Sequence, residues 1–231
     1  DLITTQVFRD PSAWYHIVAV LNTGAAESSR AALYVNGSQV TDFATENYPG
    51  SSYSTNFTAN SSSVEHVIGS NSTSSQFFDG YIAEFNFIDG QALTPSSFGE
   101  TNDDGVWVPK AYSGSYGNNG FFIDGRDSSD LGDDESGNGN DLASSGLAAA
   151  DQVSDSPTDN HCVLNALDGA GTLSDGNLVN AATGSGFVSR RATFGIPSSG
   201  KWAFRVKKSA NNFMVGLMAP RATDGDPDTN G

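Results

Sequence analysis

Oxygen-bearing side chains alternate along the last six residues, Asp226-Pro227-Asp228-Thr229-Asn230-Gly231. Asp226, Asp228 and Asn230 match the first, third and fifth positions of an Asp-x-Asp-x-Asn-Gly calcium loop, in which the glycine permits a sharp turn. A solvated turn between strands is the alternative, because half a motif is weak evidence. Calcium is therefore the cofactor for which the sequence offers candidate ligands.

A second oxygen-rich segment lies in the middle of the chain. It holds Asp133, Asp134, Asn138, Asn140 and Asp141 among glycines. Asn, Asp and Gly are also the residues that tight turns require. Metal binding and turn geometry both remain open for this segment.

Two tyrosines offer flat apolar faces in a long polar loop over residues 45–63. Tyr48 and Tyr53 stand there among Asn and Ser side chains. Sugars stack on such rings while amides and hydroxyls bind their oxygens. The same rings could instead hold the loop against the protein. The sequence therefore predicts Tyr48 and Tyr53 as carbohydrate-binding residues, with a purely structural role as the alternative.

The remaining reactive side chains form no local motif. His16, His66 and His161 are widely separated, so each is expected to be hydrogen bonded or to face solvent. Cys162 is the only cysteine, which excludes an internal disulfide and a cysteine-based zinc site. The sequence also lacks a Gly-x-Ser-x-Gly elbow and a phosphate-binding glycine loop.

Composition predicts an all-β protein with a strongly acidic body. Gly, Ser, Asn, Asp and Thr are abundant and apolar runs are short, as in many short strands joined by polar loops. Of 27 acidic residues, 24 lie at or before Ser189, together with only four of the 11 basic residues. Such a surface repels phosphate backbones and anionic lipids, so neither nucleic acid nor membrane is an expected partner. No apolar stretch approaches the roughly 20 residues that span a bilayer.

Strand patterns fill the first 100 residues. The runs 14–20 and 31–40 predict antiparallel neighbours, with Asn36-Gly37 as a type I′ hairpin turn. Further strands are expected over 2–8, 64–69 and 80–88. Thr94-Pro95 predicts one short helical turn. The chain begins inside an expected strand and stops inside a loop, so we expect it to be part of a longer polypeptide.

Strand patterns become sparse in the sequence after residue 100. Residues 101–168 are expected to be a loop-rich connector in which Gly105–Val108 and Phe121–Asp124 are buried anchors. Strand patterns resume over 169–231, most clearly in Lys201–Val206, where Trp202, Phe204 and Val206 alternate with small or charged residues. We expect Trp14 and Trp202 to lie in the cores of two different sandwiches.

Five elements of the first 100 residues occur in a familiar order. They are Trp14–Ala19, Leu33–Gly37, Val67–Gly69, Phe78–Phe85 and Leu93-Thr94. This order resembles the carboxy-terminal two-thirds of a concanavalin A-like lectin module of the laminin-G and pentraxin sort. The resemblance implies an antiparallel β-sandwich, a jelly roll, in which Trp14 fills the core.

Later segments carry a second resemblance. The order Leu93–Gly99, Trp107–Tyr116, Ser136–Leu142 and Asp151–Asn160 resembles tail-fibre and appendage proteins of marine bacteriophages. Gly200–Val206 and Val215–Leu217 are similar to the opening strands of a SPRY domain. The predicted modules are therefore a lectin-like sandwich over 1–100 lacking its first strands, the connector, and a partial SPRY-like sandwich over 169–231.

Enzymes on the lectin-like fold, the laminarinase-type glycoside hydrolases, carry the strand motif Glu-x-Asp-x-x-Glu. Glu84, Asn86 and Asp89 follow this outline, but an amide replaces the middle carboxylate and the last side chain is shorter. Retaining hydrolysis needs two carboxyl groups roughly 5 Å apart with separate roles. We therefore expect no catalytic residues and no enzyme.

The leading hypothesis is a tail-fibre or virion appendage component whose lectin-like modules attach the particle to host-surface glycans. Its expected place is the virion surface or the extracellular space, and its other partners are virion proteins or copies of itself. The alternatives are an architectural or decoration module without sugar binding, a secreted bacterial adhesin and, last, a glycoside hydrolase.

Overall fold

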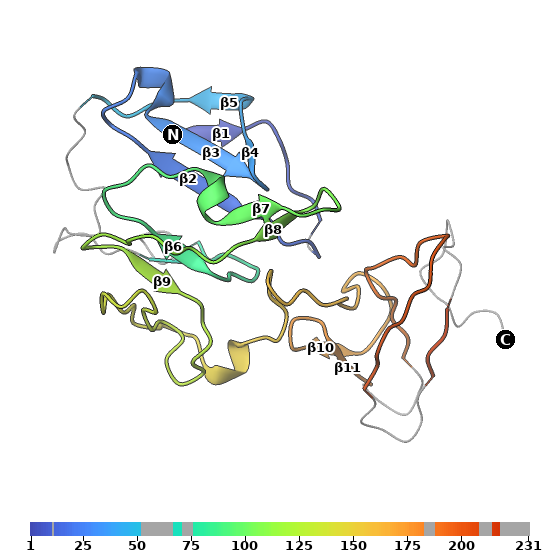
Figure 1. Cartoon of the computed structure of the whole chain (residues 1–231). Helices are drawn as coiled ribbons and strands as arrows, with labels where there is room; N and C mark the ends of the chain where they lie inside the picture. Colours follow the sequence, from blue (N-terminus) through green and yellow to red (C-terminus); the bar gives the residue numbers. More distant parts are fainter. Residues whose placement is uncertain (11, 52–66, 71–75, 183–187, 208–213, 218–231) are drawn as a thin grey trace. The chain divides into compact units, whose positions relative to one another are not determined.

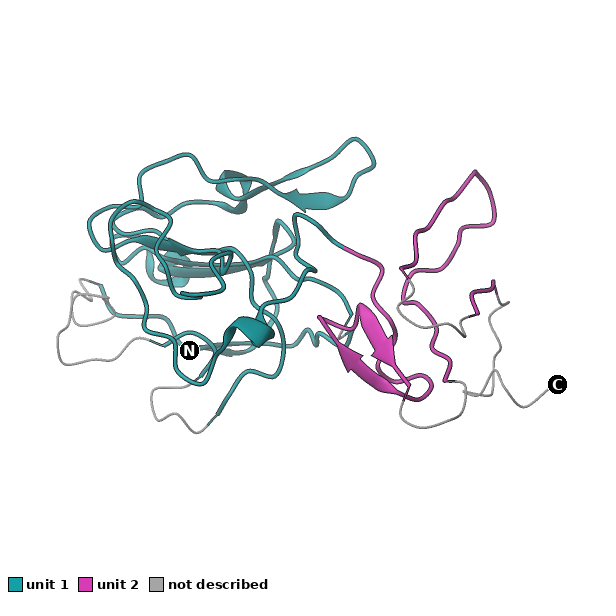
Figure 2. Ribbon diagram, turned by 90° about the horizontal axis from the view of Figure 1, so that it is seen from below, with its two compact units in different colours: residues 1–160 teal, residues 161–231 magenta. Residues whose placement is uncertain are grey.

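The computed structural model describes residues 1–10, 12–51, 67–70, 76–182, 188–207 and 214–217 (Figure 1). The chain divides into two compact units, Asp1–Asn160 and His161–Gly231 (Figure 2). Strands and three short 3-10 turns make up the regular structure of the described residues. The predicted all-β class is confirmed. No helix in this part of the chain is long and apolar enough to cross a membrane.

A meander of three strands forms the centre of the first unit. It consists of β2 (Ile17–Leu21), β3 (Ala31–Val35) and β4 (Ser38–Gln39), paired antiparallel in the order β2-β3-β4. Asn36 and Gly37 connect β3 to β4 with φ values of 48° and 79°, the positive angles that a type I′ turn needs. The predicted β3–β4 hairpin and the predicted pairing of β2 with β3 are confirmed.

Three strand pairs complete the first unit. β1 (Leu2–Thr4) pairs with β5 (Phe43–Glu46), β6 (Phe85–Phe87) with β9 (Phe121–Ile123), and β7 (Gly99–Thr101) with β8 (Trp107–Pro109). Aromatic rings reinforce the β6–β9 pair, because Phe121 stacks on Phe85 and Phe87 at centroid distances of 5.9 and 5.2 Å. The 3-10 turns η1 (Glu27–Ser29), η2 (Pro95–Ser97) and η3 (Ala149–Asp151) lie in the connections. The helical turn expected at Thr94-Pro95 is thus confirmed.

The strand predicted over 80–88 is shorter than expected. Only Phe85–Phe87 pair, because Glu84 adopts a left-handed backbone with φ of 52° that interrupts the extended conformation. Residues 64–66 of another predicted strand lie outside the described residues. Its remainder, Val67 to Gly69, forms no strand, although Ser70 bridges to Phe77.

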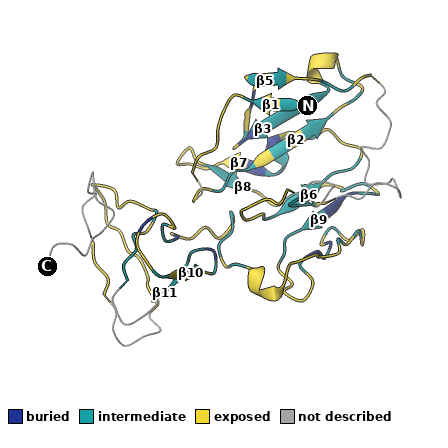
Figure 3. Ribbon diagram, turned by 180° about the vertical axis from the view of Figure 1, so that it is seen from behind, coloured by how far each residue is buried: buried dark blue, intermediate teal, exposed yellow. Residues whose placement is uncertain are grey.

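Burial concentrates at a few positions of the first unit (Figure 3). Val35, Val40, Pro95 and Phe121 are buried apolar side chains of this unit. Phe121 confirms the anchor expected there, whereas Val106 is 55% exposed and is not a buried anchor. Trp14 is half-buried, and its Nε1–H donates to Asp155 Oδ2 at 2.8 Å. Trp107 packs tightly, because a Cβ added at Gly99 would meet its ring at 2.6 Å.

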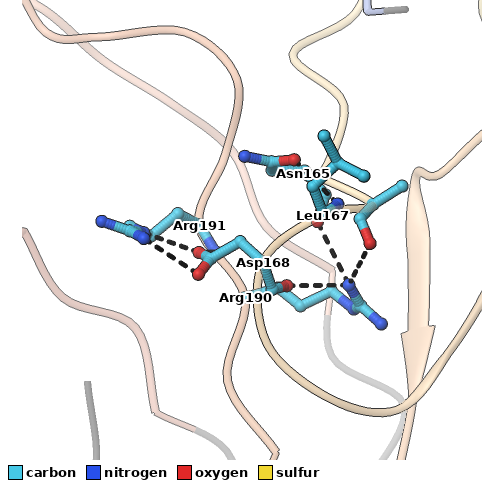
Figure 4. Close-up of polar contacts among 6 residues, drawn as sticks. Asn165, Leu167, Asp168, Arg190 and Arg191 are labelled. Atoms are coloured by element: carbon cyan, nitrogen blue, oxygen red, sulfur yellow. Dashed lines mark hydrogen bonds and ion pairs between the residues drawn. The ribbon is translucent and has the colours of Figure 1, made fainter. Parts of the chain in front are cut away.

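The second unit has one hairpin in its described residues, β10 (Thr172–Ser174) paired with β11 (Val179–Ala181). Two arginines stabilise the loop beside it (Figure 4). Arg191 binds the buried carboxylate of Asp168 through Nε at 2.6 Å and a second guanidinium nitrogen at 2.9 Å. Arg190 donates to four backbone carbonyls, those of Asn165, Ala166, Asp168 and Gly171.

The prediction of a strand over Lys201–Val206 is wrong. Residues 201–207 form no strand, all of them are exposed, and Trp202 retains 61% exposure instead of filling a core. An alternating pattern produces a strand only where a neighbouring strand accepts its hydrogen bonds and covers its apolar face. No described residue pairs with this segment, so a second sandwich is not confirmed. The predicted module boundaries at 100 and 168 stay predictions.

Candidate functional site

A pocket of about 180 Å³ lies over the hairpin of the first unit. Its walls come from η1, β3, β4, β5 and the residues that follow β5, all in the blue part of the chain in Figure 1. We call it the Tyr48 pocket. Its lining residues are Ser28, Ala31, Ala32, Gln39, Val40, Thr41, Phe43, Glu46 and Tyr48.

Local pairing positions the aromatic wall of this pocket. β5 is held against the amino terminus because Leu2 faces Glu46 in the β1–β5 register. On one side of Tyr48, Asn47 N donates to Asp1 O at 2.8 Å. On the other side, a guanidinium nitrogen of Arg30 donates to Pro49 O at 2.9 Å. Tyr48 is therefore anchored through both of its neighbours and its half-buried ring is held at the pocket.

Glu46 and Tyr48 form a polar pair on the wall. The Glu46 carboxylate lies near enough to the Tyr48 hydroxyl to act on it electrostatically. Partial burial of the ring raises the pKa of Tyr48 above its ordinary value, and the negative charge of Glu46 raises it further. The phenol therefore stays protonated throughout the physiological range.

The pocket combines the groups that a sugar ring needs. Tyr48 and Phe43 offer aromatic faces for the C–H side of a pyranose. Gln39, Thr41 and Ser28 add exposed amide and hydroxyl groups for its oxygens. Polar and aromatic side chains thus line the same pocket.

Of the residues predicted to bind carbohydrate, Tyr48 lines this pocket and Tyr53 lies outside the described residues. Sugar binding by either residue stays a prediction. Phe43, Glu46 and Gln39 were not predicted from the sequence. They are brought together by the β1–β5 and β3–β4 pairings. The one local sign of Gln39 is the short alternation of polar and apolar residues directly after the Asn36-Gly37 turn.

The three side chains of the hydrolase-like motif each accept a hydrogen bond from a different loop residue. Glu84 Oε1 accepts from the Thr158 hydroxyl at 2.6 Å. Asn86 Oδ1 accepts from the Tyr116 hydroxyl at 3.0 Å. Asp89 Oδ2 accepts from the side-chain amide of Asn119 at 2.9 Å. Each of these three hydrogen bonds therefore holds a loop against β6 or against the residues next to β6.

His16 is bound to the indole of Trp107. Its Nδ1 accepts from Trp107 Nε1–H at 3.0 Å, and the two rings lie 5.8 Å apart. Burial lowers the pKa of His16, while the charge of Glu84 acts in the opposite direction. The expectation of a hydrogen-bonded histidine is met for His16. His161 is exposed, and His66 lies outside the described residues.

Side-chain oxygens in the segment 133–141 receive protein hydrogen bonds. Asp134 Oδ1 accepts from the backbone N–H groups of Phe122 and Ser136, and Oδ2 accepts from the Ser136 hydroxyl and Asn140 N–H. Burial acts to raise the pKa of Asp134, but these hydrogen bonds together hold it below its ordinary value. We call residues 133–141 the Asp134 loop.

Two asparagine amides close the Asp134 loop against residues 117–120. Asn138 Nδ2 donates to Gly117 O and Gly120 O, and Asn140 Nδ2 donates to Asn118 O and Gly120 O. These contacts favour turn geometry over metal binding here. Within the described ranges, no group of three or more His, Cys, Asp or Glu residues could hold a metal ion. The predicted calcium ligands Asp226, Asp228 and Asn230 lie outside those ranges.

Comparison with known proteins identifies a relationship for the first part of the chain. Searches of the curated proteins and of the solved structures found no match. Residues 1–99 match the family model of the Concanavalin A-like lectin/glucanases superfamily. This match supports the lectin-like module predicted for the first 100 residues, the segment that contains the whole Tyr48 pocket.

Proposed function

We propose that this chain is an attachment protein of a virion surface or of the extracellular space, and that it binds a host-surface glycan in the Tyr48 pocket. The observation that carries the proposal is the anchored Tyr48 ring with its Glu46 partner in a pocket of about 180 Å³. The match of residues 1–99 to a superfamily of lectins and glucanases supports the same class of ligand.

The proposed setting is a phage tail fibre or appendage, as the resemblance of segments between residues 93 and 160 implies. A secreted adhesin would use the same pocket in the same way. An architectural module is the second candidate. The exposed apolar side chains in the described ranges 194–207 and 214–217 favour it, because such side chains serve assembly contacts.

We propose further that the protein is not an enzyme. Glu84 and Asp89 each accept a hydrogen bond from a loop residue, and an amide, Asn86, lies between them in the motif. This arrangement offers no pair of carboxyl groups with separate acid and nucleophile roles. We expect no hydrolysis of β-glucans in a reducing-sugar assay. Turnover by the chain that disappears in Glu84→Gln would contradict this.

A glycan array tests the attachment function. The 231-residue chain is applied with and without calcium, beside Tyr48→Ala and the control Tyr81→Ala, which removes an exposed tyrosine outside the pocket. We expect selective glycan binding that weakens about fivefold or more in Tyr48→Ala, because stacking on an aromatic ring contributes about 1 kcal/mol. Tyr81→Ala should bind as the unmodified chain does.

The other outcomes separate the candidates. A chain that binds no glycan in either condition supports the architectural module. Selective binding that Tyr48→Ala leaves unchanged places the site elsewhere and rejects the Tyr48 pocket.

A further inference from the structure

The charge of the Tyr48 pocket comes from a single side chain. Among its lining residues Glu46 is the only acidic one and none is basic. Arg30 is the basic residue closest in sequence, but its guanidinium donates to the backbone oxygens of Ala25 and Pro49. It thereby supports the chain behind Tyr48 and is not a lining residue. A ligand in the pocket therefore meets one negative charge and no positive charge from the described residues of the wall.

The other residues of the first unit add to the negative charge around the pocket. Residues 1–160 contain 22 of the 27 acidic residues and four of the 11 basic residues. Weakly screened negative charges of this number repel an anion before it reaches the wall. At the wall itself, Glu46 would stand within a few ångströms of any carboxylate or sulfate on a bound sugar.

Glu46 also retains hydrogen-bonding capacity toward a neutral sugar. An ionised carboxylate offers about four acceptor positions. The exposed side chain can therefore accept from two neighbouring sugar hydroxyls. Charge-assisted hydrogen bonds of this kind are roughly twice as strong as neutral ones.

The size of the pocket limits the ligand further. Sites for drug-sized molecules have volumes on the order of 300–1,000 Å³. A pocket of about 180 Å³ suits one sugar unit of a longer glycan.

We infer that the Tyr48 pocket selects a neutral hexose with adjacent free hydroxyls and rejects sialylated, uronic and sulfated glycans, with Glu46 as the specificity-determining residue. This inference rests on the proposed glycan binding. Glu46 binds the hydroxyls of the accepted sugar and repels the anionic ones.

Matched glycan pairs test the inference by isothermal titration calorimetry. Each pair differs by one charged group: lactose against 3′-sialyllactose, methyl glucoside against methyl glucuronide, and one neutral array ligand against its sulfated form. We expect at least one neutral member to bind and its anionic partner to bind about tenfold or more weakly. The preference should shrink as salt is raised from 20 to 500 mM.

Two variants that each remove one charge complete the test. Glu46→Gln should bring the affinities of the two members of a pair close to each other, because it removes the repulsion and weakens the hydrogen bonds to the neutral sugar. Asp79→Asn removes an exposed carboxylate outside the pocket and should leave the preference unchanged.

The failures of the two proposals are distinguishable. If no glycan binds the unmodified chain, the proposed function and this inference both fall. If neutral and anionic members bind equally, or if Asp79→Asn alters the preference as much as Glu46→Gln does, glycan binding stands and the assigned specificity is wrong.

Discussion

At the scale of single residues, His16 links protonation to stability. Its Nδ1 accepts the indole hydrogen of Trp107, so this hydrogen bond requires the neutral ring. Burial lowers the pKa of His16 in the folded chain below the value of about 6.5 that an unfolded chain has. As pH falls below about 6.5, the unfolded state binds a proton that the folded state resists. Stability is therefore complete above this pH and decreases below it.

The prediction for His16 is a lower melting temperature at pH 5.5 than at pH 7.5. The loss corresponds to about 1 kcal/mol, since one pH unit changes the free energy of a single group by at most that order. The pKa values of Asp134 and Asp168 are lowered, so their stabilisation is present above pH ~4 and is lost only at lower pH.

Thermal unfolding of His16→Asn checks this prediction. Asn retains an oxygen acceptor near the Nδ1 position but does not titrate, so the difference between the two pH values should shrink. His161→Asn, which replaces an exposed histidine, is the control and should keep the full difference. An unaltered pH dependence in His16→Asn would show that other groups cause it.

At the scale of elements, the Asp134 loop fixes β9. The Asp134 carboxylate accepts Phe122 N–H, which belongs to β9, and Glu135 N–H donates to Phe122 O at 2.9 Å. The loop thus binds both backbone polar groups of Phe122.

Asp134→Ala should lower the free energy of unfolding by roughly 2–4 kcal/mol, because four partly buried donor groups lose their acceptor. Chemical denaturation measures the change. Glu135→Ala is the control, since its exposed side chain is adjacent and its backbone contact remains. Equal destabilisation by both substitutions would mean that the loop matters only through its general charge.

Local signals explain which elements the sequence predicts correctly. Asn36-Gly37 determines its turn by backbone conformation alone, and Thr94-Pro95 determines η2 in the same way. The β6–β9 pair depends on residues more than 30 positions apart, which carry no local sign of their partner. In Lys201–Val206 the local pattern favours a strand, but a strand also needs a neighbour and the described residues supply none.

The candidate site, too, could be predicted only where the sequence signal is local. Tyr48 could be predicted because an aromatic residue in a polar loop is visible in the sequence. Glu46, Phe43 and Gln39 could not be assigned, because their common wall is created by β1–β5 and β3–β4 pairing. Turn-forming asparagines and metal-binding asparagines look alike in the Asp134 loop until their hydrogen bonds are known.

At the scale of the whole molecule, apolar exposure predicts self-association. Trp202, Phe204, Met214 and Leu217 are each at least 61% exposed. Removing such surface from water contributes about 25 cal/mol per Å², so contacts between copies are favourable. We expect the 231-residue chain to sediment as dimers or larger species at micromolar concentration.

Substitution of the exposed aromatic pair tests the source of this association. The double variant Trp202→Ser/Phe204→Ser should shift the distribution toward the monomer. Val106→Ser/Leu147→Ser removes two exposed apolar residues of the first unit and should have less effect. A monomeric unmodified chain that melts cooperatively would contradict the prediction.

Glycan binding in the Tyr48 pocket is the central claim, and an NMR titration tests it most directly. The ¹⁵N-labelled chain is titrated with the neutral glycan that binds best on the array. We expect saturable shift changes in the backbone amides of Ser28, Gln39, Thr41, Glu46 and Tyr48, and their loss in Tyr48→Ala. Shift changes confined to other regions such as the Asp134 loop, or none at millimolar glycan, would contradict it.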